Sequence, residues 1–187
     1  RGTVDAILDI PIVLPPLVVG LSLLILFNKV TLLGGGPVER WLNDHGISVT
    51  FSVAAVVLAQ FSVATAFAIR MMKNTFDQID PRCEDVALTL GCNRSRAFWQ
   101  IALPQAGQGV VAAGVLAWAR ALGEFGPILV FAGATRGRTE VLATSVFLEI
   151  NIGNLSGAAA ISLMMIALAL GLISLIRSRS LDSGTPF

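Results

Sequence analysis

The stretch DPRCEDVALTLGCNRSRAFWQIALP, residues 80–104, decides how the chain is organised, because it is a polar passage between long hydrophobic segments. Asp80 suits a helix N-cap, Gly91 suits a left-handed position after a first helix, and Pro104 is predicted to end a second helix. Four small or apolar residues of the first helix recur at the i, i+3, i+4, i+7 spacing of one outward face: Cys83, Val86, Ala87 and Leu90. An apolar face on a polar segment predicts a partner.

The composition places the chain in a membrane. Hydrophobic residues make up 55% of the 187 residues and charged residues 13%, which is about half of the roughly 25% found in soluble domains. The net charge of +1 and the lack of long runs of like charge argue against a nucleic-acid partner. The composition therefore predicts an all-α integral membrane protein, a polytopic helical bundle in contact with lipid.

Four hydrophobic segments are long enough, at about 1.5 Å per residue, to cross roughly 30 Å of hydrocarbon. They cover residues 10–27, 47–69, 106–132 and 158–176. Polar side chains within the second segment, such as Gln60, are expected to face other helices. A shorter segment, Leu142 to Ile150, predicts a short interfacial or re-entrant helix.

The distribution of cations predicts which side each loop occupies. Four spans put the N-terminal flank, the loop 71–104 and the C-terminus on one side, which carries eight Lys or Arg residues against four on the other. Because cations are enriched on the cytoplasmic side, the loop 71–104 and the C-terminus are predicted to be cytoplasmic.

Prolines and charges interrupt two of the predicted spans. Pro15 and Pro16 free backbone carbonyls that lipid cannot satisfy, which predicts either an ordinary kink or a carbonyl-lined path. Arg120 and Glu124 stand four residues apart and can neutralise each other, so they predict either a clamp between helices or a translocation path or gate. Two glycines that permit close helix contact complete this candidate path, Gly123 and Gly126.

Catalytic and metal-binding patterns are missing from the sequence. It lacks the phosphate-binding G-x-x-x-x-G-K-[ST] loop, so ATP hydrolysis is not expected of this chain. A single histidine, His45, removes most catalytic triads and metal sites that use histidine. Cys83 and Cys92 have no neighbouring ligands, so neither a metal site nor a cofactor is predicted. These absences favour a transport or scaffold subunit over an enzyme.

The polar stretch resembles the cytoplasmic signature loop of ABC-importer permeases, which reads E-A-A-x3-G-x9-I-x-L-P. The matching positions are Asp85-Val86-Ala87, then Gly91, and then three residues of the second helix, Ile101, Leu103 and Pro104. Asp85 and Val86 depart from the pattern, although Glu84 supplies a carboxylate one residue earlier.

This resemblance implies that the first helix is a coupling helix, which docks into a groove on a separate ATP-binding cassette ATPase. The implied contact residues are Cys83, Glu84, Asp85, Val86, Ala87, Leu90 and Gly91. An amphipathic helix held between two spans can enter such a groove and transmit movement to the membrane helices.

Three further strings resemble permeases for tetrahedral oxyanions, molybdate most of all, with sulfate and tungstate next. They are PIVLPPLVVGLSLL at 11–24, ARALGEFG at 119–126 and GRTEVL at 137–142. Such permeases have about six spans, so this chain would hold the last four and be truncated at its N-terminus. The resemblance also implies a permease homodimer and a periplasmic or lipoprotein substrate-binding protein.

Other functions stay open on the residues alone. Arg120, Glu124 and the proline-broken first span would also suit an ion path in a secondary transporter or channel. Lys29, Arg136 and Arg138 on the external side either help to receive the anion or simply solvate loops and contact lipid headgroups.

Overall fold

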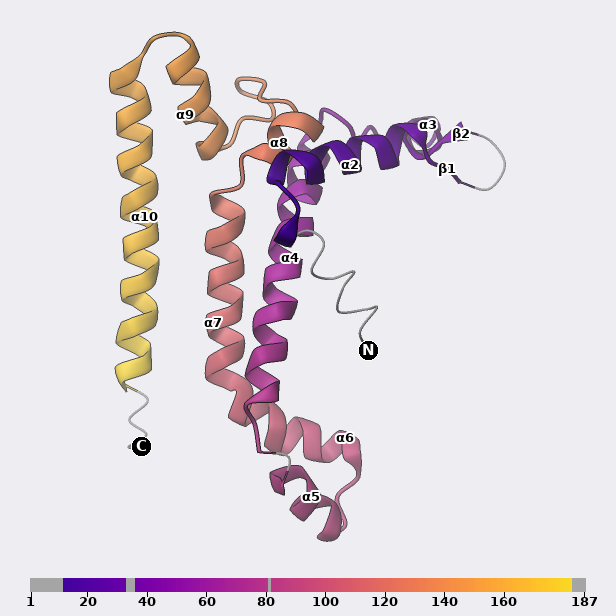
Figure 1. The fold of residues 1–187 in the computed structure, drawn as a ribbon, viewed down its shortest axis with the longest axis vertical. Coiled ribbons are helices and arrows are strands. Elements are labelled where there is room, and N and C mark those ends of the chain that lie inside the picture. The colour runs from indigo at the N-terminus through magenta and orange to yellow at the C-terminus, as the bar shows by residue number, and fades with distance from the viewer. Residues whose placement is uncertain (1–11, 33–35, 81, 183–187) are drawn as a thin grey trace.

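The fold is a set of helices with one minimal strand pair (Figure 1). The computed structural model describes residues 12–32, 36–80 and 82–182. In chain order the elements are α2 (Pro16–Lys29), β1 (Thr31–Leu32), β2 (Gly36–Pro37), α3 (Val38–Asp44), α4 (Val53–Asp77), α5 (Arg82–Thr89), α6 (Arg94–Ala97), the π-helix η1 (Phe98–Ala102), α7 (Leu103–Leu122), α8 (Gly126–Phe131), α9 (Leu142–Asn151) and α10 (Leu155–Asp182). The predicted all-α polytopic membrane fold is confirmed.

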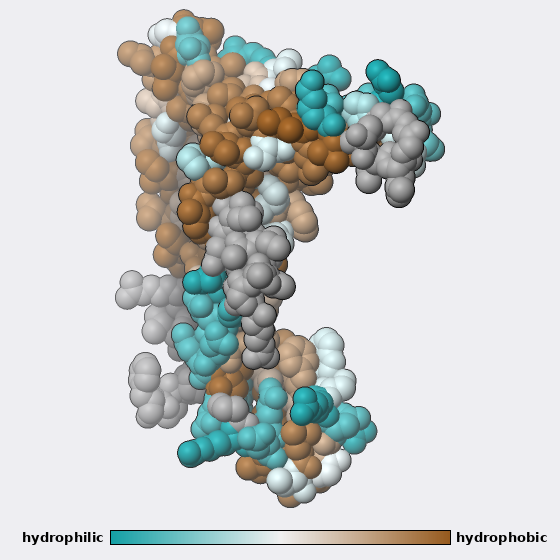
Figure 2. All heavy atoms as spheres, turned by 45° about the vertical axis from the view of Figure 1, so that its right-hand side comes forward, coloured by the Kyte–Doolittle hydropathy of each residue, from teal (hydrophilic) through white to brown (hydrophobic). Residues whose placement is uncertain are grey.

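Three described helices are long and apolar enough to cross a membrane: Val53–Asp77, Arg94–Leu122 and Leu155–Ser174. They run side by side along the long axis, with α5 and α6 at one end and α2, α3, α8 and α9 at the other (Figure 1). Hydrophobic residues cover much of the upper and middle part of the face in Figure 2, whereas hydrophilic residues gather at the α5–α6 end and at the tip beside α3.

The first predicted span, 10–27, differs from the structure. Residues 10 and 11 lie outside the described part, and the helix that follows, α2, begins only at Pro16. Its 14 residues extend roughly 21 Å at about 1.5 Å each, less than the hydrocarbon thickness. Figure 1 shows α2 lying crosswise at the upper end of α4 instead of alongside the long helices. Pro15 and Pro16 start a new helix here, since proline fits a first turn but cannot continue a preceding helix.

The second predicted span, 47–69, is displaced towards the C-terminus. The helix α4 begins at Val53, because the side chain of Ser52 caps it by accepting a hydrogen bond from the N–H of Ala54 (3.1 Å). It then continues to Asp77, so the first seven residues of the predicted loop 71–104 are helical. The fourth predicted span, 158–176, lies within α10.

The third predicted span, 106–132, is two helices. The helix α7 ends at Leu122, and α8 begins at Gly126 after a short break. At the other end, the prediction that Pro104 ends a helix was wrong, because α6, η1 and α7 follow one another without interruption. The N–H of Leu103 donates to the carbonyl of Phe98, five residues earlier, and this π turn accommodates a proline that offers no N–H of its own.

Small residues bring α4 and α7 together. The buried positions of α4 include Ala59, Val63 and Ala66, and those of α7 are all alanines, Ala106, Ala113 and Ala117. Small side chains let membrane helices approach closely, where packing replaces the missing hydrophobic driving force. As expected, Gln60 faces the other helix and donates from its side-chain nitrogen to the carbonyl of Ala121 (3.0 Å).

The helices α2 and α8 cross with their backbones in contact. A Cβ atom added to Gly20 would lie 2.7 Å from the Cα of Pro127, and one added to Gly126 would lie 3.0 Å from the backbone nitrogen of Leu17. A cluster of buried residues from α4, α8 and the segment before α4 lies beneath this crossing, where the rings of Phe27 and Phe131 are 5.4 Å apart. The crossing therefore leaves room for no side chain larger than hydrogen.

We expect Gly20→Ala to lower the thermal-unfolding midpoint of the detergent-solubilised protein. The added methyl group meets backbone atoms of Pro127, which cannot rotate away, so the cost should be about 1–3 kcal/mol. The matched control is Gly114→Ala in α7, where nothing lies within 4 Å of the added atom and the midpoint should not fall. Equal midpoints for the two variants would contradict the close crossing.

Candidate functional site

The polar stretch begins as predicted, with a short helix, a glycine turn and a second helix, but the second helix continues through η1 into α7. Asp80 accepts a hydrogen bond at its side-chain oxygen from the N–H of Arg82 (3.0 Å) and so caps α5. Gly91 has a φ of +90°, the left-handed conformation that reverses the chain after α5. Asn93 then caps α6 by accepting from the N–H of Arg96 (2.8 Å). These local interactions fix where each short helix begins.

The four residues of the predicted coupling face do not all point outward. Val86 is 58% exposed and Leu90 is 80% exposed, whereas Ala87 is only 4% exposed and packs inside the helical pair. Cys83 is half-buried. Because Ala87 is enclosed by its own chain, only Val86 and Leu90 offer a large apolar surface to another molecule.

The remaining signature positions lie around this face. Glu84 is half-buried and Asp85 is exposed, and the described residues supply no ion pair for either carboxylate. Half-buried Ile101 lies in η1, and Leu103 and exposed Pro104 begin α7. The aromatic ring of Phe98 stacks on Phe76 of α4 at 5.9 Å, which ties the helical pair to both long helices. The stacked rings therefore join the polar stretch to α4.

A pocket of about 300 Å³ at the opposite end contains all six residues of the predicted path or gate. Its lining residues are Pro15, Pro16, Leu17, Arg120, Gly123, Glu124, Phe125 and Gly126. The α2–α8 crossing holds the proline segment against the break between α7 and α8. Residues more than a hundred positions apart in the sequence thus share one cavity.

The charged pair of this pocket is unequally buried. Nη1 of Arg120 lies 3.0 Å from Oε2 of Glu124, so the predicted ion pair forms, although Glu124 lies beyond the end of α7. The side chain of Arg120 is 35% exposed and that of Glu124 is 1% exposed. The guanidinium also lies over the ring of Phe67, 5.3 Å from its centroid. Both residues line the cavity, and the carboxylate is the more deeply buried of the two.

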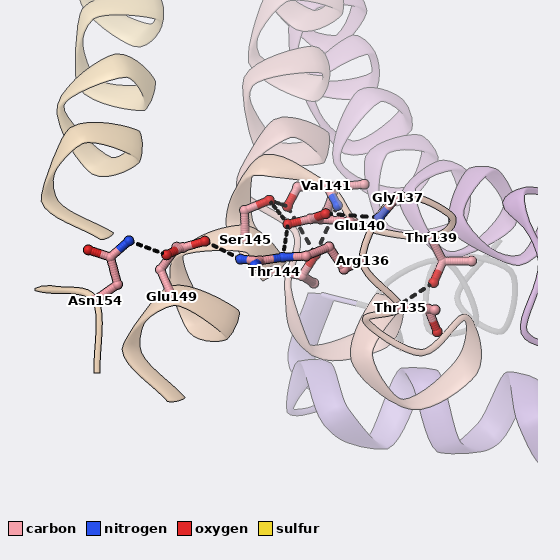
Figure 3. A network of polar contacts seen from close by, with 10 residues as sticks. All are labelled: Thr135, Arg136, Gly137, Thr139, Glu140, Val141, Thr144, Ser145, Glu149 and Asn154. Atoms are coloured by element: carbon pink, nitrogen blue, oxygen red, sulfur yellow. Dashed lines mark hydrogen bonds and ion pairs between the residues drawn. The ribbon is translucent and has the colours of Figure 1, made fainter. Parts of the chain in front are cut away.

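A polar network that the sequence analysis did not predict fixes the loop before α9 (Figure 3). Arg136 forms ion pairs with Glu140 and with Glu149, and Asn154 donates to the other oxygen of Glu149 (2.6 Å). Thr139 donates to the carbonyl of Gly133. The spacing of Arg136 and Glu140 was the available signal, whereas the pairing with Glu149 depends on how α9 folds back.

This network includes one of the cations that the sequence analysis placed on the external side. Arg136, one of the candidates to receive an anion, is held by two carboxylates, while Arg138 is exposed.

A larger cavity of about 520 Å³ lies beside the loop and is lined by Gln60, Leu122, Glu140, Val141, Leu142 and Ser145. Its one charged lining residue is the carboxylate Glu140, which would repel an anion. Among the described residues, no group of three or more metal-ligating side chains comes together.

Comparison with protein families matches residues 1–182 to the family described as "Binding-protein-dependent transport system inner membrane component". The chain belongs to this family. The family name and the three membrane-length helices among the described residues agree with a multi-pass protein of the inner membrane. The resemblance noted from residues 80–104 is confirmed.

Relatives of the chain carry transport names. It is 39% identical over 160 residues to the "Molybdenum transport system permease protein ModB" of Mycobacterium tuberculosis, covering 86% of this chain and 58% of the relative. It is 35% identical over 179 residues to the protein of that name from Escherichia coli, covering 95% and 76%. The Escherichia coli "Sulfate transport system permease protein CysT" is 31% identical over 173 residues, covering 92% and 61%. The chain thus spans little more than half the length of the mycobacterial relative.

The loop network should weaken in acid. The N–H of Gly137 (3.1 Å), the hydroxyl of Ser145 (2.9 Å) and the charge of Arg136 hold the pKa of Glu140 below its usual value. A lowered pKa stabilises the fold above the ordinary value of about 4.3, and that contribution is lost as pH falls through the pKa of the folded state.

We therefore expect wild type to unfold at a higher temperature than Glu140→Gln at pH 7, with the difference shrinking below about pH 4. Unfolding midpoints of the two proteins measured from pH 7 to pH 3 provide the test. A difference that stays constant over this range would show that the charge of Glu140 does not stabilise the loop.

Proposed function

We propose that this chain is the membrane-spanning subunit of an ATP-driven importer for a tetrahedral oxyanion, with molybdate as the first candidate and sulfate or tungstate as alternatives. The observation that carries the proposal is the exposed apolar surface of Val86 and Leu90 on α5, a short helix between two membrane-length helices. The relatives named as molybdenum and sulfate transport permeases support the choice of substrate class.

The proposed partner at α5 is a separate ATP-binding cassette ATPase. Val86 and Leu90 would enter a groove on the ATPase, while buried Ala87 keeps α5 fixed to α6 and η1. Closure of the ATPase would push α5, and the stacked rings of Phe76 and Phe98 would pass the displacement to α4 and α7. The α5–α6 end and the C-terminus would face the cytoplasm, as the cation distribution favours.

The opposite end would face the substrate-binding protein, which is periplasmic or a lipoprotein in this proposal. The loop network before α9 supplies a fixed surface there, since Arg136 is held on both sides by carboxylates. A second copy of the chain would complete the path. The helix α10 leaves most of its surface uncovered, which suits contact with lipid or with that second copy.

A second candidate is a secondary transporter or channel, favoured by the charged pair at a cavity in the break between α7 and α8. The two functions differ in their energy source. In vesicles that contain the permease, the ATPase and the binding protein, molybdate uptake should require ATP and stop when the ATPase is catalytically dead. Uptake that continues with the dead ATPase would favour the second candidate.

We expect Leu90→Glu to abolish ATP-dependent uptake while the protein stays in the membrane at its normal level. Leu90 is 80% exposed, so the charge disturbs an intermolecular contact without entering the core of this chain. The matched control is Ser95→Glu, which adds the same charge at an exposed position of α6 and should retain uptake. Normal uptake by Leu90→Glu would rule out α5 as the coupling contact.

Substitutions that disturb the helical pair itself test its rigidity. Gly91→Pro is expected to abolish uptake because proline cannot adopt the φ of +90° found there. Ala87→Glu should have the same effect because it forces a charge into a buried position. Both proteins should still reach the membrane, which immunoblotting of membrane fractions can check. Normal uptake by either variant would contradict the proposed coupling.

A further inference from the structure

We propose that the pocket at Arg120 is a low-affinity oxyanion site, in which Arg120 binds the anion and Glu124 orients the arginine and limits its affinity. This inference rests on the proposed function, because it assigns the residue that contacts the oxyanion on its way through the membrane. It goes further by giving the two members of the ion pair different tasks.

The pocket has the size and lining that a small hydrated anion needs. Its volume of about 300 Å³ corresponds to roughly ten waters at about 30 Å³ each, enough for a tetrahedral oxyanion with part of its hydration shell. Arg120 and Glu124 are the two charged residues among its lining residues. The other lining residues are prolines, glycines, Leu17 and Phe125, which carry no charge. Arg120 is therefore the one cation that lines the pocket among the described residues.

Arg120 has donors to spare for an anion. A guanidinium carries five N–H groups in a planar fork, and here Nη1 is the nitrogen closest to Glu124. The ring of Phe67 supports the guanidinium plane without using an N–H group. Since the arginine side chain lines the pocket and is 35% exposed, its remaining edge can offer the paired N–H groups that suit an oxyanion.

Glu124 is placed to hold the arginine in position, and the ion pair is kept while the anion is bound. Its side chain is 1% exposed, and Oε2 has no hydrogen bond among the described residues despite the ion pair at 3.0 Å. If the arginine swung away completely, a buried carboxylate would be left without a counter-charge, which is costly. The arginine therefore keeps one edge on Glu124 while the other edge meets the anion.

The carboxylate also weakens the site. A second negative charge beside the guanidinium opposes an arriving oxyanion, so binding is looser than to an isolated arginine. Loose binding suits a translocation path, because an ion must leave a site as readily as it enters. This division of tasks distinguishes the proposal from a clamp, in which the pair would only hold the end of α7 beside α8.

Removing both charges together distinguishes an oxyanion site from a clamp that only holds the end of α7 beside α8. The double variant Arg120→Gln/Glu124→Gln replaces the ion pair by two neutral amides, one of the same shape as glutamate and one shorter than arginine. It leaves no unpaired buried charge and should fold normally. The test uses the complete complex with the ATPase and the binding protein in vesicles, with molybdate and radiolabelled sulfate as probes. Arg40→Gln on exposed α3 is the matched control for loss of an arginine.

The double variant is expected to reach the membrane at the wild-type level, to retain ATP hydrolysis and to lose at least about tenfold in oxyanion uptake. Glu124→Gln alone should bind sulfate more tightly than wild type, on the order of tenfold, in equilibrium binding to the complex without binding protein, and should release it more slowly. Arg40→Gln should behave as wild type in both measurements.

Wild-type uptake by the double variant would overturn the inference and leave the proposed function standing. Equal or weaker sulfate binding by Glu124→Gln at normal protein level would overturn the task assigned to the carboxylate. If the wild-type complex imports neither oxyanion, the proposed function fails first, and the inference falls with it.

Discussion

The crossing of α2 over α8 is the contact on which the upper end of the molecule depends. Gly20 and Gly126 let the two backbones touch, with Pro127 and Leu17 as their neighbours. This contact holds the proline segment before α2 against the break after α7, and the cavity at Arg120 exists only because these two pieces meet. A larger residue at either glycine would push the two helices apart and so change the cavity.

The two ends of the molecule are connected by α4 and α7. At one end these helices lead to the helical pair α5–α6, where Phe76 and Phe98 stack. At the other end Gln60 of α4 donates to the last turn of α7, next to the break that carries Glu124. Small buried residues along both helices permit close contact between them, so the two ends are joined by one packed helix pair.

Local signals in the sequence predicted local structure well. The cap at Asp80 and the left-handed Gly91 follow from short-range hydrogen bonding and backbone freedom, and the ion pair of Arg120 with Glu124 follows from their spacing. Hydropathy alone could not show that α2 lies across the bundle, since an apolar segment of this length suits either arrangement.

Other features depended on the tertiary fold. The enclosure of Ala87 by α6 and η1, the π turn that admits Pro104 and the pairing of Arg136 with Glu149 each involve a partner whose position the local pattern does not specify.

The most direct test of the account is the position of the heavy metal atom in an electron cryo-microscopy structure of the complete complex with molybdate. We expect density for the oxyanion between Pro16 and Arg120, with its oxygens about 2.9 Å from the guanidinium nitrogens and the contact with Glu124 retained. Density for molybdate elsewhere along the path would contradict the account. In that structure Arg120 and Glu124 would be paired only to each other, and side chains would fill the pocket.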